Sequence, residues 1–262
     1  MAIMAKRMFE NIGGKTIAFF ITVYEIFVLL GRTIRAFPKI WFYRRQLIEQ
    51  IYQFSVKTLP IASVIAIFVG LGSTVQGTYQ SSALIPRYLT VNVIYKSAII
   101  ELCPVILSLV LAGKLGAALA AEIGSMKITE QIDALETMSL DPVGFLVFPR
   151  LLAGIIMLPV IAVFANFLAI FSSFFISSVA THWISPMEYI NGLQLNYKTF
   201  ELLFGTLFKP AFFGVIISLI GSYFGLKTIG GATGVGRAST MAVVVSAVLI
   251  VIFDYYLGKL LL

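Results

Sequence analysis

The sequence predicts an all-α integral membrane protein, and three observations support that prediction. Of the 262 residues, 59% are hydrophobic and only 12% are charged, whereas soluble domains carry about 25% charged residues. The mean hydropathy is +0.97. Two long stretches, 58–86 and 151–187, contain no Asp, Glu, Lys or Arg. Because a spanning helix needs about 20 largely apolar residues, the chain is expected to cross a membrane several times.

We expect five spans, at roughly 58–80, 95–120, 150–179, 201–226 and 238–258. A shorter apolar run, 16–30, precedes them and contains Glu25. Because this run is short for a span, an interfacial helix lying on the membrane is favoured over a sixth span. The run has no small-residue cleavage site, so a signal peptide is not expected. The predicted organisation is a cytoplasmic or interfacial segment, 1–45, followed by a five-span domain, 46–262.

The lysines and arginines predict the orientation, because cytoplasmic loops carry an excess of positive charge. With the N-terminus inside, thirteen of these residues face the cytoplasm and four face the outside. The predicted location is therefore the inner (cytoplasmic) membrane, with a cytoplasmic N-terminus and a C-terminus on the outer face. The net charge of +7 requires no nucleic acid partner, because anionic lipid headgroups account for the basic cluster 32–45.

Reactive side chains are too scarce to predict an enzyme. Cys103 is the single cysteine and His182 the single histidine, so we expect no catalytic residues and no bound metal. The sequence also lacks GxxxxGK[ST], the phosphate-binding loop of many ATPases. If ATP drives transport, a separate subunit must bind and hydrolyse it, and this chain itself is expected to need no cofactor.

A polar segment, 121–150, lies between two apolar spans and carries five acids against two bases. Its middle part predicts a short amphipathic helix of about ten residues, 129–138, with apolar residues at helical spacing. Thr129 is the expected N-cap, and Asp141-Pro142 is expected to stop the helix. On the cytoplasmic side, contact with lipid would favour Lys and Arg over acids. A docking element for another protein is therefore favoured over a plain solvated helix.

Two charged side chains lie inside predicted spans at similar depth from the outer face: Glu101 in the second and Lys209 in the fourth. Charges within a membrane are costly, so each is a candidate for function. Similar depth allows an ion pair, while the alternative is that both face an aqueous vestibule separately or snorkel outward. Lys114 lies nearer the inner side and is expected to snorkel or to meet Glu122.

The fourth span also contains a GxxxG pair, Gly221 and Gly225. Small residues at four-residue spacing allow helices to approach closely in lipid. Packing within the subunit is favoured over contact between subunits. The glycine-rich residues 227–237 predict a mobile connector between the last two spans.

An ordered series of motifs runs from the second span to the third. It reads Glu101-Leu102-Cys103-Pro104, Ala112-Gly113-Lys114-Leu115-Gly116-Ala117-Ala118, Ala121-Glu122-Ile123-Gly124, Thr129-Glu130-Gln131, Asp141-Pro142 and Pro149-Arg150. A second series is Gly234-Val235-Gly236-Arg237-Ala238-Ser239-Thr240 followed by Asp254-Tyr255. In these motifs the chain closely resembles the MlaE/YrbE family of ABC-transporter permeases, which move lipids between membranes. Two positions depart from the family pattern: Cys103 replaces a glycine, and Ile100 stands where many relatives have an arginine.

The resemblance implies a homodimer of five-span subunits with a lipid cavity at its centre. It implies a coupling helix that docks in a groove of a cytoplasmic ATPase, with the coupling residues Thr129, Glu130, Gln131, Asp133 and Glu136. It places the family's intramembrane glutamate and lysine, on the lipid path, at Glu101 and Lys209. It further implies a substrate-binding partner of the MCE type, phospholipid or a related lipid as the ligand, and ATP bound only by the partner subunit.

A secondary transporter is the alternative function. Such a protein could use Glu101 and Lys209 to carry protons, but secondary transporters typically show internal repeats, and none is visible here. An intramembrane enzyme is disfavoured by the lack of a suitable His, Cys or Ser arrangement. The sequence therefore predicts the permease subunit of an ATP-driven lipid transporter.

Overall fold

The computed structural model describes residues 2–81, 84–195 and 198–261. Within these residues the regular structure is helical throughout, without strands, which confirms the all-α prediction. The first half contains α1 (Ala2–Arg35), η1 (Phe37–Lys39), α2 (Arg44–Phe54), α3 (Leu59–Gln80), α4 (Arg87–Ser97), η2 (Ala98–Leu102), α5 (Cys103–Leu111), η3 (Ala112–Gly116) and α6 (Ala117–Ile128). The second half contains α7 (Gln131–Thr137), η4 (Val143–Val147), α8 (Phe148–Phe174), η5 (Phe175–Ala180), α9 (Pro186–Gln194), α10 (Thr199–Leu203), η6 (Phe204–Phe208), α11 (Lys209–Leu226) and α12 (Gly231–Leu261).

Several of these elements join into longer helical stretches that are apolar enough to cross a membrane. Six such stretches occur among the described residues: Thr16–Arg35, Arg44–Gln80, Arg87–Ile128, Val143–Ala180, Thr199–Leu226 and Gly231–Leu260. The last five contain the five predicted spans and extend each of them. Polar helical turns lengthen the spans at their ends, and hydropathy alone does not detect them.

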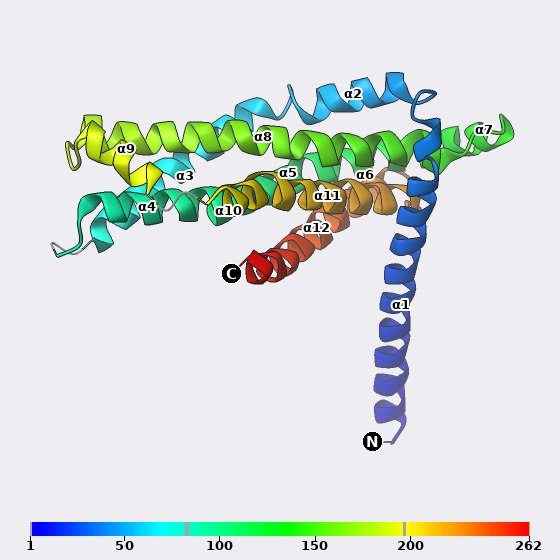
Figure 1. Ribbon diagram of the computed structural model, residues 1–262. Coiled ribbons are helices and arrows are strands. Elements are labelled where there is room, and N and C mark those ends of the chain that lie inside the picture. Colours follow the sequence, from blue (N-terminus) through cyan, green and yellow to red (C-terminus); the bar gives the residue numbers. More distant parts are fainter. Residues whose placement is uncertain (1, 82–83, 196–197, 262) are drawn as a thin grey trace.

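The remaining stretch belongs to α1, which is longer than the predicted run 16–30. It runs crosswise to α8 and meets the bundle only near one end (Figure 1). Glu25 fixes it there, because its carboxylate accepts hydrogen bonds from the Tyr223 hydroxyl at 2.7 Å and from the Lys227 ammonium at 2.6 Å. A helix that runs across the bundle axis does not cross the same membrane alongside the bundle. Because Thr16–Arg35 is itself apolar and long enough to cross a membrane, the interfacial placement stays a prediction.

The core of the bundle forms around α8, which packs against α3 on one side and α11 on the other, while α11 also contacts α6 and α12. Large apolar side chains such as Phe54, Leu107, Leu158 and Phe213 are fully buried there. Close packing, rather than exclusion of water, drives association of helices in lipid. The stability of the bundle therefore depends on how closely the surfaces of neighbouring helices fit together.

The GxxxG pair of α11 shows this dependence on shape. A Cβ atom at Gly221 would lie 3.1 Å from the carbonyl oxygen of Gly116, and one at Gly225 would lie 2.7 Å from the Cβ of Ile123. Both partners belong to the same chain. Of the two alternatives for Gly221 and Gly225, the structure therefore shows packing within the subunit.

The connector predicted at 227–237 is shorter than expected. The helix α11 ends at Leu226 and α12 begins at Gly231, so most of the glycine-rich stretch is helical. The turn itself uses Gly230 and Gly231, with φ of 92° and 71°, a conformation that residues with a Cβ rarely adopt. The prediction of a long mobile connector was wrong because glycines are well tolerated in membrane helices, where neighbouring helices support the backbone.

Candidate functional site

The polar segment between α6 and α8 forms one end of the bundle, where α7 lies beyond the start of α8 (Figure 1). We call this the α7 end. The side chain of Ile132 is buried in a cluster with Ile123 and Leu146, and Leu135 packs against the same cluster. The side chains of Glu130, Asp133 and Glu136 are exposed. The amphipathic helix is therefore present, with its apolar face on the bundle and its acids outward, although it is shorter than the predicted 129–138.

Thr129 does not cap the start of α7, so that prediction was wrong. It follows the last residue of α6, and its hydroxyl donates a hydrogen bond to the carbonyl of Ser125 at 2.9 Å. Glu130 then turns the chain in the left-handed conformation, with φ of 58°. The side-chain Nε2 of Gln131, not its backbone N–H, donates to the Thr129 hydroxyl at 2.9 Å. The second span continues as helix up to Ile128, so a tight turn rather than a capped start separates the two helices.

One acid of the 121–150 segment holds a buried cation. Glu122 pairs with Arg150 at 2.8 Å, and the Arg150 side chain is only 5% exposed. Arg150 also donates to the carbonyl of Leu146 at 2.6 Å. The expected meeting of Lys114 with Glu122 does not occur, because Lys114 reaches back to the carbonyl of Lys57 instead.

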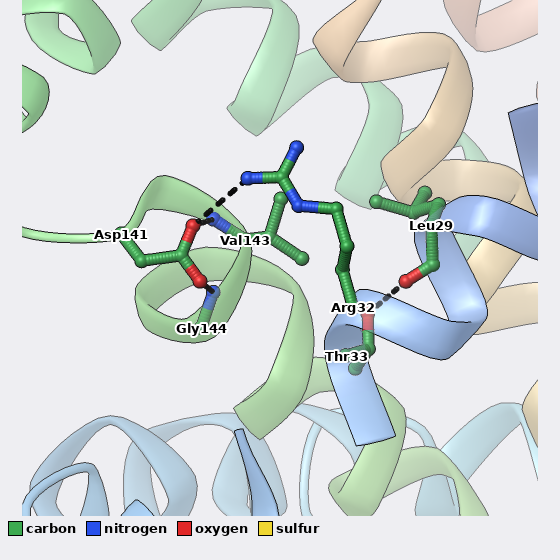
Figure 2. A network of polar contacts seen from close by, with 6 residues as sticks. All are labelled: Leu29, Arg32, Thr33, Asp141, Val143 and Gly144. Carbon is green, nitrogen blue, oxygen red and sulfur yellow. Dashed lines mark hydrogen bonds and ion pairs between the residues drawn. The ribbon is translucent and has the colours of Figure 1, made fainter. Parts of the chain in front are cut away.

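A second acid, Asp141, organises the start of the third span. Its two carboxylate oxygens accept the backbone N–H groups of Val143 at 3.3 Å and Gly144 at 3.1 Å. Arg32 of α1 approaches the same carboxylate at 3.2 Å (Figure 2). A carboxylate at a helix start satisfies unpaired N–H groups and complements the helix dipole. Asp141 therefore caps the helix that follows α7 and ties α1 to it.

The other three acids remain on the surface of α7. Asp133 accepts an ion pair from Lys127 at 2.8 Å. Among residues 2–81, 84–195 and 198–261, no ion pair to Glu130 or Glu136 occurs. The exposed face of α7 is therefore acidic and is only partly neutralised by Lys127. A surface of this kind is suited to contact a basic groove on another protein.

Inside the spans, the structure brings Glu101 and Lys209 together. The ammonium nitrogen of Lys209 lies 2.5 Å from Oε2 of Glu101 and 2.9 Å from Oδ1 of Asp254. The Lys209 side chain is fully buried, whereas that of Glu101 is 47% exposed and that of Asp254 is 14% exposed. One cation thus neutralises only one of two carboxylates. The lysine cluster, as we call these three residues, presents its surplus acid toward the surface.

Two widened helical turns position the lysine cluster. Glu101 lies within the π-helical turn η2, and Lys209 directly follows the π-helical turn η6. The two turns touch at Gly205, where a Cβ atom would lie 2.8 Å from the Cα of Ile100. The missing side chain therefore allows the second and fourth spans to approach at the depth of the charges. Single π-helical turns within α-helices are frequent at functional sites.

The third member of the cluster, Asp254, was not selected as a site residue from the sequence, although it stands in one of the motifs quoted above. The signal was available, because a carboxylate within the predicted span 238–258 is as costly as Glu101. What the linear sequence does not provide is the rotation of α12, which turns this carboxylate toward Lys209. The cluster borders an open pocket of about 710 Å³ whose wall includes Lys96, Glu201 and Tyr255. The arrangement places a partly exposed carboxylate beside this pocket, where it can contact a polar or cationic group.

A bundle of apolar spans with an acidic helix at one end and a charged cluster within it defines a multi-pass helical membrane protein as the class. Comparison with known proteins agrees. The family model described as permease MlaE matches residues 47–260. A probable ABC transporter permease protein of Synechocystis is 38% identical, over 83% of this chain and 82% of that protein. One of Rickettsia felis is 30% identical, over 96% of both chains.

The chain belongs to the MlaE family of ABC transporter permeases. The family match covers the five predicted spans and leaves the whole of α1 outside. A plant relative, the chloroplastic protein TRIGALACTOSYLDIACYLGLYCEROL 1 of Arabidopsis thaliana, is 31% identical over 88% of this chain and 66% of that protein. The motif series found in the sequence was therefore identified correctly, and a multi-pass permease subunit is the class it predicted.

Proposed function

We propose that this chain is the membrane subunit of an ATP-driven transporter that moves phospholipid or a related lipid between membranes. Membership of the permease family supports the ABC mechanism over the secondary-transporter alternative. The name of the Arabidopsis relative, which refers to a galactosylated diacylglycerol, supports a glycerolipid as the class of substrate. In this proposal an MCE-type protein exchanges lipid with the permease on its outer side.

The exposure of Glu101 is the observation that carries the proposal. A carboxylate that is half exposed within a membrane span is costly unless protein, water or a polar ligand covers it. A second copy of the chain, facing the exposed apolar side of α12, would enclose the lysine cluster in a central cavity. The lipid headgroup would then pass the surplus carboxylate while the acyl chains remain among apolar side chains.

The ATPase is proposed to dock on α7. Its acidic face, which includes Glu130, Asp133 and Glu136, lies at the end of the bundle that the distribution of Lys and Arg predicts to be cytoplasmic. The apolar face, anchored by Ile132, would transmit movement of the ATPase to α6 and to η4 at the start of the third span. Thr129, Gln131 and Asp133 complete the proposed contact.

Affinity purification of the tagged chain from its native membrane, with identification of the bound proteins and lipids, tests the assembly. We expect a second copy, an ATPase, an MCE-type protein and bound phospholipid. Reconstitution of the purified complex with fluorescent phospholipid then tests the mechanism. Lipid transfer that requires ATP supports the proposal, whereas transfer driven by a proton gradient without ATP would favour the secondary transporter.

A further inference from the structure

The segment that joins α1 to α2 carries five cations and no acid. Its basic residues are Arg32, Arg35, Lys39, Arg44 and Arg45, and all five side chains are exposed. Arg32 is held by Asp141. The other four form no ion pair within the described ranges 2–81, 84–195 and 198–261. A concentrated positive charge of this size is not explained by the fold.

Aromatic side chains stand exposed among these cations. Phe37, Trp41 and Phe42 expose 58%, 78% and 63% of their surface. Exposed aromatic rings beside Lys and Arg are typical of the region where a protein meets lipid headgroups. The neighbouring helix α1 runs crosswise to the bundle and also exposes apolar residues such as Phe27. Exposed aromatic and basic side chains next to such a helix favour contact with lipid over contact with a protein.

The segment is rigidly held on the bundle. Thr33, Ala36 and Tyr43 are buried beneath the exposed residues. The Tyr43 ring lies 6.2 Å from the ring of Phe148 at the start of α8. Burial, followed by the nearby Asp141 carboxylate, raises the pKa of Tyr43, so the phenol stays neutral. Figure 2 shows Arg32 and Thr33 on the same turn of α1, with Arg32 directed toward Asp141.

We propose that Arg35, Lys39, Trp41, Phe42 and Arg44 form a binding surface for anionic phospholipid headgroups in the leaflet at the α7 end. We call it the basic–aromatic surface. The cations contact lipid phosphates and the rings enter the headgroup layer. Attraction of a polybasic segment to an anionic leaflet is worth about fivefold in affinity for each Lys or Arg. Because Arg32 contacts Asp141, four residues after the end of α7, the proposed surface would be linked to the segment proposed to contact the ATPase.

The two tryptophans of the chain, Trp41 and Trp183, provide the test. The full-length Trp183→Phe protein, in phosphatidylcholine vesicles, reports on Trp41 alone. We expect brominated phosphatidylglycerol to quench this fluorescence at lower mole fraction than brominated phosphatidylcholine. Neutralising three cations (Arg35→Gln, Lys39→Gln and Arg44→Gln) should reduce the preference for phosphatidylglycerol by about fivefold for each charge.

The Trp41→Phe protein supplies the matched control, because Trp183 lies near Arg87 at the opposite end of the bundle. The three substitutions should leave quenching of Trp183 unchanged. Equal quenching of Trp41 by the two lipids would overturn the proposal, as would a preference that survives the substitutions. Quenching that appears only after removal of the ATPase would assign the surface to a protein partner instead. If the triple variant fails to assemble, the single Lys39→Gln variant decides by the same criterion. The inference rests on membrane placement and does not depend on the transport activity.

Discussion

The acidic face of α7 and the lysine cluster both carry more acid than base, but they differ in their surroundings. On α7, Glu130 and Glu136 are exposed and the helix is held by the buried Ile132. In the lysine cluster, the fully buried ammonium of Lys209 holds the two carboxylates directly. On α7, therefore, different residues carry the charge and hold the helix in place. In the lysine cluster, the same residues do both.

This difference determines what mutations reveal. Water screens the acids of α7, so they can be changed with little effect on the fold. A buried ion cannot lose its partner without leaving another charge unpaired at low dielectric. Charge substitutions at the α7 end should consequently affect binding of a partner protein alone. Charge substitutions within the spans should affect both folding and function.

The largest loss of stability is expected from Lys209→Met. It leaves Glu101 and Asp254 unpaired and adjacent, and removing one partner of a buried pair typically costs about 3–5 kcal/mol. We expect a sharp fall in the yield of purified protein and in its thermal unfolding midpoint in detergent. If the Lys209→Met protein were as stable as the wild type, the ion pairs of the lysine cluster would not contribute to stability.

The same variant provides a way to separate folding from transport. Adding Glu101→Gln and Asp254→Asn to Lys209→Met removes all three charges, so assembly should recover. A double substitution at Glu101 and Lys209 alone would leave Asp254 unpaired, and it is therefore the weaker test. If the charges guide the lipid headgroup, the triple variant should assemble and transfer lipid poorly in reconstituted complexes. Full transfer would show that the charges are dispensable.

Next in size is Ile132→Ala on the buried face of α7. Truncation of a buried Ile to Ala costs about 2–5 kcal/mol, and here the loss should be local, because α7 has few other anchors. We expect faster hydrogen exchange in 129–138 and weaker retention of the ATPase. Unchanged exchange in this segment would contradict the role of Ile132 as its anchor.

A smaller effect is expected from Gly205→Ala, where η6 meets η2. The added Cβ atom would lie 2.8 Å from the Cα of Ile100, and overpacking of this kind costs about 1–3 kcal/mol. Because the clash separates the turns that carry Glu101 and Lys209, lipid transfer should fall with the unfolding midpoint. Gly72→Ala is the matched control, since nothing lies within 4 Å of a Cβ atom there.

The smallest change in stability is expected from the pair Glu130→Lys and Glu136→Lys. Exposed substitutions usually change the free energy of unfolding by no more than about 0.5 kcal/mol, so the protein should fold and insert normally. Co-purification of the ATPase should nevertheless be lost, with Glu130→Gln and Glu136→Gln giving an intermediate result. Full retention of the ATPase by the charge-reversed protein would remove α7 as the docking element.

Local sequence patterns predicted the structure correctly where a feature depends only on residues close together in the chain. Hydropathy located the five spans, because an apolar run in lipid must satisfy its backbone hydrogen bonds as a helix. The helical spacing of apolar residues within 129–138 predicted one buried face, and the structure shows that Ile132 and Leu135 form it. The same local reasoning misplaced the N-cap at Thr129, since the end of α6 depends on packing against the neighbouring spans rather than on the residues of the turn.

By itself the sequence determined the helical membrane class, the family and the positions of Glu101 and Lys209 within spans. Composition, hydrophobic length and ordered motifs are all properties of the linear chain. Only the tertiary structure decided that one ammonium serves both Glu101 and Asp254, and that Arg32 of α1 meets Asp141 beyond α7. These contacts join elements that are far apart in the chain. Their side chains meet because whole helices are rotated and crossed, and close packing at positions such as Gly205 determines how.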